Sequence, residues 1–258
     1  MSPSTSSGQA DIVLTERPHE HVALLRLNRP QQLNALSNAL VERLAGGLET
    51  LASDGVTRAV VITGDARAFA AGADIAEFAA AGPRLEVWDR LWSCPLPLVA
   101  AVRGVALGGG LELAMSCDLM VVADDARLGQ PEINLGVMPG AGGTQRLTRV
   151  LGKALATEMV LLGRELSGRE AEHHGLANRA VPAERVLPVA VELARRLAQQ
   201  APEALRAAKR AIAQAFEESL HAGLIDERRA FYALLQSADA REGVTAFLEK
   251  RSPVWQQR

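Results

Sequence analysis

The segment from Pro97 to Asp124 restricts the fold more than any other part of the chain. A short apolar run ends at Gly104, and a second apolar run, LMVVAD, covers 119–124. Apolar runs of this length, bounded by proline or glycine, are typical of buried strands. Three consecutive glycines at 108–110 and the helical pattern LELAMSCD at 111–118 separate the two runs. This order of strand, glycine turn, helix and strand argues for an α/β fold.

The rest of the segment 11–200 repeats the alternation of strands and helices. Periodicity and the positions of proline and glycine predict strands at 11–16, 21–27 and 59–63, and helices at 37–53, 84–93, 144–151, 153–162, 168–174 and 183–200. Asp74 stands near the start of a further helix, and residues 126–133 are expected to form a loop.

The composition changes at about residue 201. The following residues are rich in alanine and charge, and their helical periodicity predicts three or so helices. Their apolar stripe is either core or an oligomer interface, because a small helical appendage buries little by itself. The stripe consists of Leu205, Ala208, Ile212, Phe216 and Leu220. We therefore predict a disordered tail at 1–10, a core domain at 11–200 and a helical, oligomerising subdomain at 201–258.

The composition of the 258 residues excludes some classes of protein. A hydrophobic share of 48% leaves room for a substantial core, and a net charge of −2 indicates no strong attraction to nucleic acid or to a membrane. No apolar run approaches the ~18 residues of a membrane span, and the amino terminus lacks the pattern of a signal peptide. Neither the five histidines nor the two cysteines have the spacing of metal ligands. These features predict a cytoplasmic protein without a metal.

The glycines at 108–110 and two glutamates are the residues best suited to chemistry. Glycine allows close approach of a ligand to backbone N–H groups, and a helix that begins there directs free donors outward. Gly109 and Glu112 are three residues apart and share a helix face, which would place a carboxylate near a polarised carbonyl. The alternative is a tight turn with a solvent-facing acid. Glu112 is either a helix-face charge or a partly buried acid with a raised pKa, and Glu132 is either a second catalytic acid or a surface loop residue.

Five motifs occur in order between residues 11 and 251. They are LNRPQQLNAL at 27–36, AFAAGADI at 68–75, PLVAAVRGVALGGGLELAMSCD at 97–118, GQPEINLGVMPGAGGTQRL at 129–147 and AFLEKR at 246–251. Together they resemble the enoyl-CoA hydratase/isomerase, or crotonase, superfamily. The resemblance implies a spiral of ββα units with a helical carboxyl-terminal part, assembled as a homotrimer or a dimer of trimers.

The resemblance also implies roles for individual residues. The backbone N–H groups of Ala73 and Gly109 would form an oxyanion hole for a thioester carbonyl, and Glu112 and Glu132 would hold and activate one water. Gly140 would shape the site around that water, and Lys250 would reach the coenzyme A phosphates from a neighbouring subunit. The path of coenzyme A would be lined by Ala71, Ala73, Asp74, Ile75 and Ala76.

The chain departs from the family pattern at Ala76, where many relatives carry a lysine. Arg29 could supply the missing charge, or it could be a structural surface residue. The acyl pocket would draw on residues 78–95, which include Phe78, Trp88 and Trp92, although these aromatic residues could equally form the core of a helix pair.

The glutamate pair is the residue-level argument for hydration, because other branches of the superfamily often keep only one. We expect a hydro-lyase that adds water to a trans-2-enoyl-CoA and yields a 3-hydroxyacyl-CoA, with coenzyme A as part of the substrate and no other cofactor. The alternatives are a Δ3,Δ2-enoyl-CoA isomerase, a pathway-specific acyl-CoA hydratase and a non-catalytic RNA-binding relative. The near-neutral charge counts against RNA binding.

Overall fold

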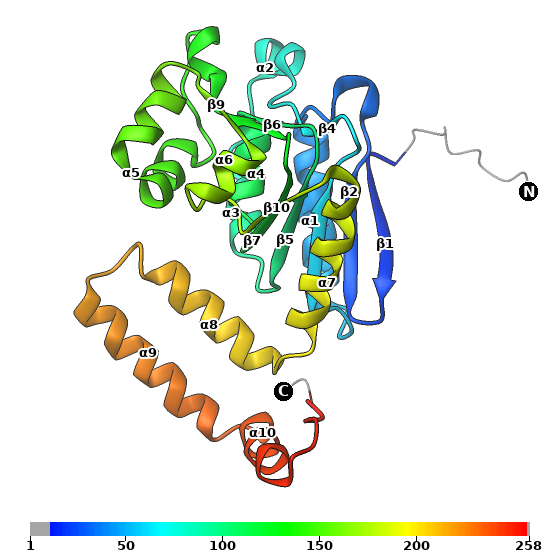
Figure 1. Cartoon of the computed structure of the whole chain (residues 1–258), viewed down its shortest axis with the longest axis vertical. Coiled ribbons are helices and arrows are strands. Elements are labelled where there is room, and N and C mark those ends of the chain that lie inside the picture. Colours follow the sequence, from blue (N-terminus) through cyan, green and yellow to red (C-terminus); the bar gives the residue numbers. More distant parts are fainter. Residues whose placement is uncertain (1–10, 257–258) are drawn as a thin grey trace, which may run out of the picture.

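A computed structural model describes residues 11–256. The predicted disordered tail at 1–10 lies outside the described residues. Two sheets and the helices around them form the body of the molecule, and helices alone continue beyond it (Figure 1). The predicted α/β class is therefore confirmed.

The larger sheet has six strands, in the order β1-β2-β3-β5-β7-β10. Only β1 pairs antiparallel; the other strands are parallel. The strands are β1 (Val13–His19), β2 (Val22–Leu27), β3 (Ala59–Thr63), β5 (Leu98–Val102), β7 (Leu119–Ala123) and β10 (Arg179–Val181). Every residue of β3 and β5 is buried, as expected for parallel strands covered on both faces.

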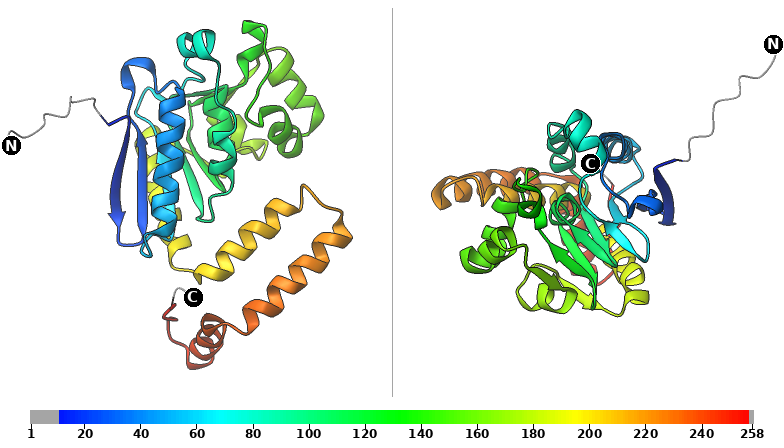
Figure 2. Two further views of the ribbon diagram at one scale, coloured as in Figure 1. Left: turned by 180° about the vertical axis from the view of Figure 1, so that it is seen from behind. Right: turned by 90° about the horizontal axis from the view of Figure 1, so that it is seen from above.

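Helices cover both faces of this sheet. Helix α7 (Val186–Ala198) packs on β2, β3, β5 and β7, and α1 (Asn38–Ser53) lies on the opposite face (Figures 1 and 2). The side chain of Ser37 caps α1 by accepting from the N–H of Leu40. The apolar stripe of α1 is buried, which confirms the helix predicted at 37–53.

A second sheet of four short strands was not predicted. Its order is β4-β6-β8-β9, with β4, β6 and β8 parallel and β9 antiparallel. The strands are β4 (Ala68–Ala70), β6 (Val105–Leu107), β8 (Arg127–Gly129) and β9 (Glu165–Ser167). The loop expected at 126–133 was wrong at β8, because a three-residue strand is too short to show an alternating pattern.

The remaining helices of the body are short, except for one. They are η1 (Pro30–Gln32), α2 (Ile75–Ala81), α3 (Val87–Trp92), α4 (Gly109–Met115), η2 (Pro131–Leu135), α5 (Gly143–Leu161), α6 (Gly168–His173) and η3 (Ala183–Arg185). The two helices expected at 144–151 and 153–162 form α5, which is kinked at Gly152 because this glycine has a φ of 74°.

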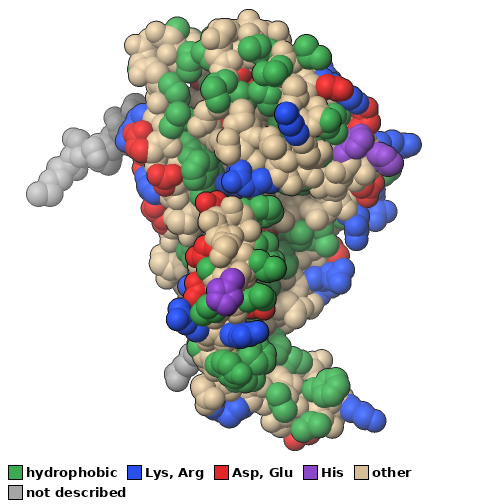
Figure 3. Space-filling view, turned by 90° about the vertical axis from the view of Figure 1, so that its left-hand side faces the viewer, with side chains coloured by type: hydrophobic (Ala, Val, Ile, Leu, Met, Phe, Trp, Pro, Cys, Tyr) green, Lys and Arg blue, Asp and Glu red, His purple; other side chains and the backbone are tan. Residues whose placement is uncertain are grey.

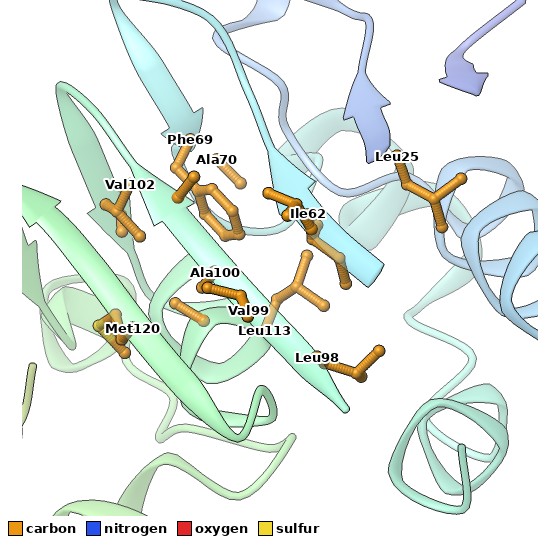
Figure 4. Close-up of a cluster of buried hydrophobic side chains, with 14 of the residues drawn as sticks. Leu25, Ile62, Phe69, Ala70, Leu98, Val99, Ala100, Val102, Leu113 and Met120 are labelled. Carbon is orange, nitrogen blue, oxygen red and sulfur yellow. The ribbon is translucent and has the colours of Figure 1, made fainter. Parts of the chain in front are cut away.

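The core includes the space between the two sheets and α4 as well as the faces of the larger sheet that α1 and α7 cover. Phe69 of β4 is fully buried and lies beside the strands β3 and β5 of the larger sheet, and Leu113 of α4 is part of the same cluster (Figure 4). Helix α4 approaches β4 closely, because a methyl group built on Gly110 would lie 2.0 Å from the carbonyl oxygen of Ala70. A glycine is therefore required where α4 crosses the second sheet.

From Pro202 the chain is helical, with α8 (Pro202–Gln214), α9 (Leu220–Leu235) and α10 (Ala238–Glu249). These three helices confirm the predicted helical part. Helices α8 and α9 lie side by side and project from the body (Figures 1 and 2). The predicted stripe is not a core of this chain, because Ile212, Phe216 and Leu220 are 67%, 53% and 80% exposed. No helix among residues 11–256 is long and apolar enough to cross a membrane.

The close crossing at Gly110 is testable by two alanine substitutions. Gly110→Ala places a methyl group against backbone and is expected to lower the free energy of unfolding by about 2 kcal/mol or more. Gly46→Ala is the control, because the methyl group meets nothing within 4 Å and α1 gains about 0.5–1 kcal/mol. Urea denaturation measures both values, and equal effects would contradict the packing.

Candidate active site

Three parallel strands of the second sheet end at one edge. The residues that follow β4, β6 and β8 therefore emerge close together. They are Ala71–Ala73 after β4, Gly108–Gly109 after β6, and Gln130–Glu132 after β8. The sheet brings together three of the predicted site residues, Ala73, Gly109 and Glu132, from separate parts of the sequence.

The backbone beside Ala73 is held by a strand-like pairing with Leu36. The N–H of Leu36 donates to the carbonyl of Gly72 at 2.8 Å, and the N–H of Asp74 donates to the carbonyl of Leu36 at 3.1 Å. These two bonds use the groups on either side of Ala73. Its own N–H consequently faces away from Leu36 and donates to no protein acceptor among residues 11–256.

Gly109 begins α4, so its N–H has no acceptor within the helix. The preceding Gly108 has a φ of 52°, a left-handed conformation that favours glycine. A methyl group built on Gly109 would lie 3.8 Å from the nitrogen of Ala73 and 3.9 Å from Oε2 of Glu112. The missing side chain thus leaves open the space that borders both predicted donors and one predicted carboxylate.

Glu112 is buried in the first turn of α4, with an exposure of 3%. Its Oε1 accepts two hydrogen bonds of 2.8 Å, from the N–H groups of Ala141 and Gly143 at the start of α5. Burial raises the pKa of Glu112, while these two donors and the cation of Arg146 oppose the rise. The expectation of a buried acid with a raised pKa is confirmed, and a solvent-facing charge is excluded.

Glu132 lies in η2, on the other side of the glycines. A methyl group built on Gly108 would lie 3.1 Å from Oε1 of Glu132 and 3.8 Å from Cα of Gly72. Burial raises the pKa of Glu132 to about 7, and the charge of Glu112 adds to the rise. The charge of Glu112 therefore acts on Glu132 across the turn formed by Gly108 and Gly109.

This geometry combines two directed N–H donors with two carboxyl groups of different environment. Donors of this kind stabilise a negative charge that develops on a carbonyl oxygen. A carboxylate held by backbone donors can accept a proton, and a carboxyl group with a pKa of about 7 can donate one near neutral pH. Among residues 11–256, no group of three or more histidine, cysteine, aspartate or glutamate side chains could hold a metal.

The residues predicted along the path of coenzyme A lie beside this site, at the start of α2. Asp74 caps α2 by accepting from the N–H of Glu77, and it forms an ion pair of 2.8 Å with Arg29. Arg29 also donates to the carbonyl of Ala35, so its guanidinium is engaged with the protein. Ile75 and Ala76 are exposed, and Ala71 is half-buried.

Gly140 directly precedes Ala141, whose N–H donates to Oε1 of Glu112, so it lies at the edge of the site. A methyl group built on Gly140 would lie 3.3 Å from Cδ1 of Leu85, in the segment before α3. Lys250 follows α10, at the end of the molecule opposite α2 (Figure 1). Within one chain Lys250 does not meet Ala73 or Gly109, and its proposed contact requires a neighbouring subunit.

The predicted aromatic residues divide between core and surface. Trp88 is buried at 5% exposure, which supports its role in the core. Phe78 and Trp92 are 39% and 37% exposed. The indole N–H of Trp92 donates to Oγ of Ser116, which follows α4.

Sequence reasoning missed the two donors to Glu112. Ala141 and Gly143 lie in the motif PGAGG, from which only Gly140 was assigned a role. Both residues bind Glu112 through backbone N–H groups, so the identity of their side chains gives no indication of this role. The glycine-rich entry into a helix was the available signal, because such an entry directs free N–H groups at an anion.

Comparison with known proteins gives a consistent result. A family model described as enoyl-CoA hydratase/isomerase matches residues 17–258. The chain is 47% identical over 241 residues to the 2,3-dehydroadipyl-CoA hydratase of Escherichia coli, covering 91% of this chain and 94% of that protein. It is 40% identical over 258 residues to the mitochondrial enoyl-CoA hydratase of Pongo abelii, covering 96% and 89%. A crystal structure of an enoyl-CoA hydratase from Bacillus anthracis matches with a TM-score of 0.91 and 37% identity, covering 96% of this chain and 100% of that one.

The raised pKa of Glu132 predicts a stability difference that depends on pH. The folded state binds this proton more tightly than the unfolded state, so the stability of the protein falls as the pH rises from about 4.5 to about 7. Glu132→Gln removes this effect. We expect it to raise the free energy of unfolding by about 1–3 kcal/mol at pH 8, with a much smaller gain at pH 5.

Denaturant unfolding at the two pH values measures the difference. Glu172→Gln, at an exposed position of α6, is the matched control and should show the same small change at both. A gain for Glu132→Gln that does not increase with pH would contradict the burial of its charge.

Proposed function

The chain belongs to the enoyl-CoA hydratase/isomerase family, and we propose that it hydrates the 2,3 double bond of trans-2-enoyl-CoA thioesters. The observation that carries this proposal is the placement of two acids at one glycine turn. Glu112 and Glu132 border the adjacent glycines Gly109 and Gly108, and the nitrogen of Ala73 borders the same space. A water between two carboxyl groups, next to an oxyanion hole, is what a hydratase requires.

The proposed reaction begins at the thioester carbonyl. Its oxygen accepts hydrogen bonds from the N–H groups of Ala73 and Gly109, which polarises the conjugated double bond. Glu112, as a carboxylate, takes a proton from the water as the oxygen of that water bonds to C3. The electron pair of the double bond moves toward the thioester, and the resulting enolate oxygen is stabilised by the two donors.

The second proton transfer completes the product. Glu132 in its protonated form gives a proton to C2, which yields the 3-hydroxyacyl-CoA. A pKa of about 7 leaves a substantial fraction of Glu132 protonated near neutral pH. Glu112 then carries the proton taken from water, and its return to Glu132 through the next bound water restores the starting state.

We further propose that coenzyme A passes the start of α2. Ala71 and Ala73 approach the thioester end, and Asp74, Ile75 and Ala76 border the path of the pantetheine and adenine. Exposure of Ile75 at 51% agrees with a surface that a ligand covers. Lys250 would bind phosphate from a neighbouring subunit, which explains its distance from the site in one chain.

One relative suggests a narrower substrate. The E. coli protein is named for 2,3-dehydroadipyl-CoA, a thioester with a second carboxylate. A pathway-specific hydratase is thus a second candidate, and rates with acyl chains of different length and charge separate it from a general hydratase. A Δ3,Δ2-enoyl-CoA isomerase is less well supported, because both acids border the site.

Hydration is tested by the loss of enoyl absorbance with crotonyl-CoA and longer trans-2-enoyl-CoA substrates. We expect turnover by the wild type, and a fall in kcat of about 10²–10⁴ for Glu112→Gln and for Glu132→Gln, since each loses a proton transfer. Glu172→Gln should retain the wild-type rate. Absence of turnover with every enoyl-CoA would overturn the proposal, and full activity of Glu132→Gln would remove its assigned role.

We also propose that the helices after residue 201 bind further copies of the chain, as a trimer or a dimer of trimers. Apolar side chains are exposed on this helical part of the molecule (Figure 3). Leu220 at the start of α9 is 80% exposed, and Phe247 and Leu248 of α10 are 82% and 74% exposed. Exposed apolar area of this kind marks an interaction surface. Since the helices project as an arm, a neighbouring body is the natural surface to cover it.

Sedimentation velocity tests the assembly. The wild type should sediment as three or six chains, and the double variant Leu220→Asp with Phe247→Asp should shift toward smaller species, because buried carboxylates oppose association. Val56→Asp, at a 42% exposed apolar position of the body, is the control and should leave the assembly intact. A monomeric wild type would contradict this proposal.

A further inference from the structure

Arg146 is a half-buried cation that the reaction described above does not use. It lies in the first turn of α5, where its backbone N–H donates to the carbonyl of Gly142 at 2.8 Å. Burial lowers its pKa, although a guanidinium stays charged at any ordinary pH. Among the residues described here, no carboxylate forms a close ion pair with it. Because burying a charge without an ion pair costs free energy, we expect this cation to serve a function.

The side chain of Arg146 packs against the backbone at 141–143, which holds the Glu112 carboxylate. A methyl group built on Gly142 would lie 3.2 Å from Nε of Arg146, so the side chain fills the space that this glycine leaves. Gly142 stands between Ala141 and Gly143, the two donors to Oε1 of Glu112. The cation therefore lies against the backbone segment that grips the carboxylate.

Trp92 contacts the guanidinium of Arg146 through the face of its ring. Cζ of Arg146 lies 5.4 Å from the centre of the Trp92 ring, within the range of a cation–π contact. The indole N–H donates to Oγ of Ser116 at 3.0 Å, and that hydroxyl donates to the carbonyl of Glu112 at 2.8 Å. A chain of contacts thus runs from Arg146 through Trp92 and Ser116 back to the backbone of Glu112.

We propose that Arg146, stacked on Trp92, is a positioning residue that fixes the Glu112 carboxylate for the removal of a proton from water. This inference rests on the proposed hydratase function. Arg146 acts on Glu112 through its charge and through its packing on the α5 segment that holds the carboxylate. Trp92 provides the platform and ties it to α4.

The charged groups around the pair agree with this assignment. Arg146 is influenced by Glu112 of α4, by Arg149 of its own helix and by Glu217 of the segment between α8 and α9. The thiol of Cys117, which follows α4, also lies near it, but burial raises its pKa and keeps it neutral. The charge of Glu112 in turn raises the pKa of Glu132 in η2. Arg146 is the cation that favours the charged form of Glu112, because its field lowers the pKa that burial raises.

The pH dependence of hydration tests the proposal, using crotonyl-CoA and the variants Arg146→Gln, Arg146→Lys and Trp92→Phe. Loss of the cation raises the pKa of Glu112, so the acid limb of kcat/KM for Arg146→Gln should move to higher pH by about 1 unit. We expect kcat to fall about 10-fold, with KM within about 3-fold of the wild type. Arg146→Lys keeps the charge and should restore most of the acid limb, while Trp92→Phe keeps the ring and should have the smaller effect.

Lys153→Gln is the matched control, since it removes a positive charge from an exposed position of the same helix. It should leave the profile and the rate unchanged. If Arg146→Gln fails to fold, the acid limbs of the pH profiles of Arg146→Lys and Trp92→Ala are compared instead. Trp92→Ala removes the ring that supports the guanidinium, so its acid limb should move to higher pH. The acid limb of Arg146→Lys should stay at the wild-type position.

Two results would overturn the inference. A wild-type pH profile for Arg146→Gln, with active wild-type enzyme, would show that Arg146 does not act on Glu112. An effect confined to KM, and only for acyl chains that end in a carboxylate, would make Arg146 a substrate ligand instead. If the wild type itself does not turn over crotonyl-CoA, the hydratase function is refuted. This outcome is distinct from failure of the Arg146 proposal, because the wild type is assayed before any variant.

Discussion

The hydrogen bonds from the amino terminus of α5 to the Glu112 carboxylate are the interaction on which the rest of the site depends. A carboxylate with 3% exposure would be costly to bury without partners, and two backbone N–H groups supply them at 2.8 Å. The same bonds join α4 to α5, so the helix that starts at the proposed oxyanion hole is oriented by the acid that it carries. Glu112 is consequently a structural joint as well as the proposed base.

The second sheet provides the other constraint. Because β4, β6 and β8 are parallel, their carboxyl ends deliver Ala73, Gly109 and Glu132 to one edge. Small residues at that edge keep it open: side chains on Gly108 or Gly109 would enter the space beside the two acids. The site is thus made by strands of three residues each, held rigidly by the core around Phe69.

The two acids receive different environments from this arrangement. Glu112 has two backbone donors and a nearby cation, whereas Glu132 lies in η2 under the influence of burial and of its neighbour's charge. Environments that separate two carboxyl groups in this way assign one to accept a proton and the other to donate it. The exposed apolar side chains of α8 and α9 support the proposal that further copies of the chain complete the functional unit.

Much of the fold could be predicted from the sequence, because long amphipathic and apolar runs report burial directly. The helix at 37–53, the buried strand at 59–63 and the three helices after 201 are examples. Strands β4, β6, β8 and β9 were missed, since three residues carry no period. The meeting of Ala73 with Gly109 therefore came from family resemblance and not from spacing. Ala141 and Gly143 were missed because they act through backbone N–H groups, which every residue except proline has, and not through a recognisable side chain.

The most direct test of the shared water site is a crystal structure with a 3-oxoacyl thioester of coenzyme A, which has no double bond to hydrate. The account predicts that the thioester oxygen accepts hydrogen bonds from the N–H groups of both Ala73 and Gly109. It also predicts one water within hydrogen-bond distance, about 2.6–3.2 Å, of both Glu112 and Glu132. A thioester bound away from these donors, or carboxyl groups too far apart to share a water, would contradict it.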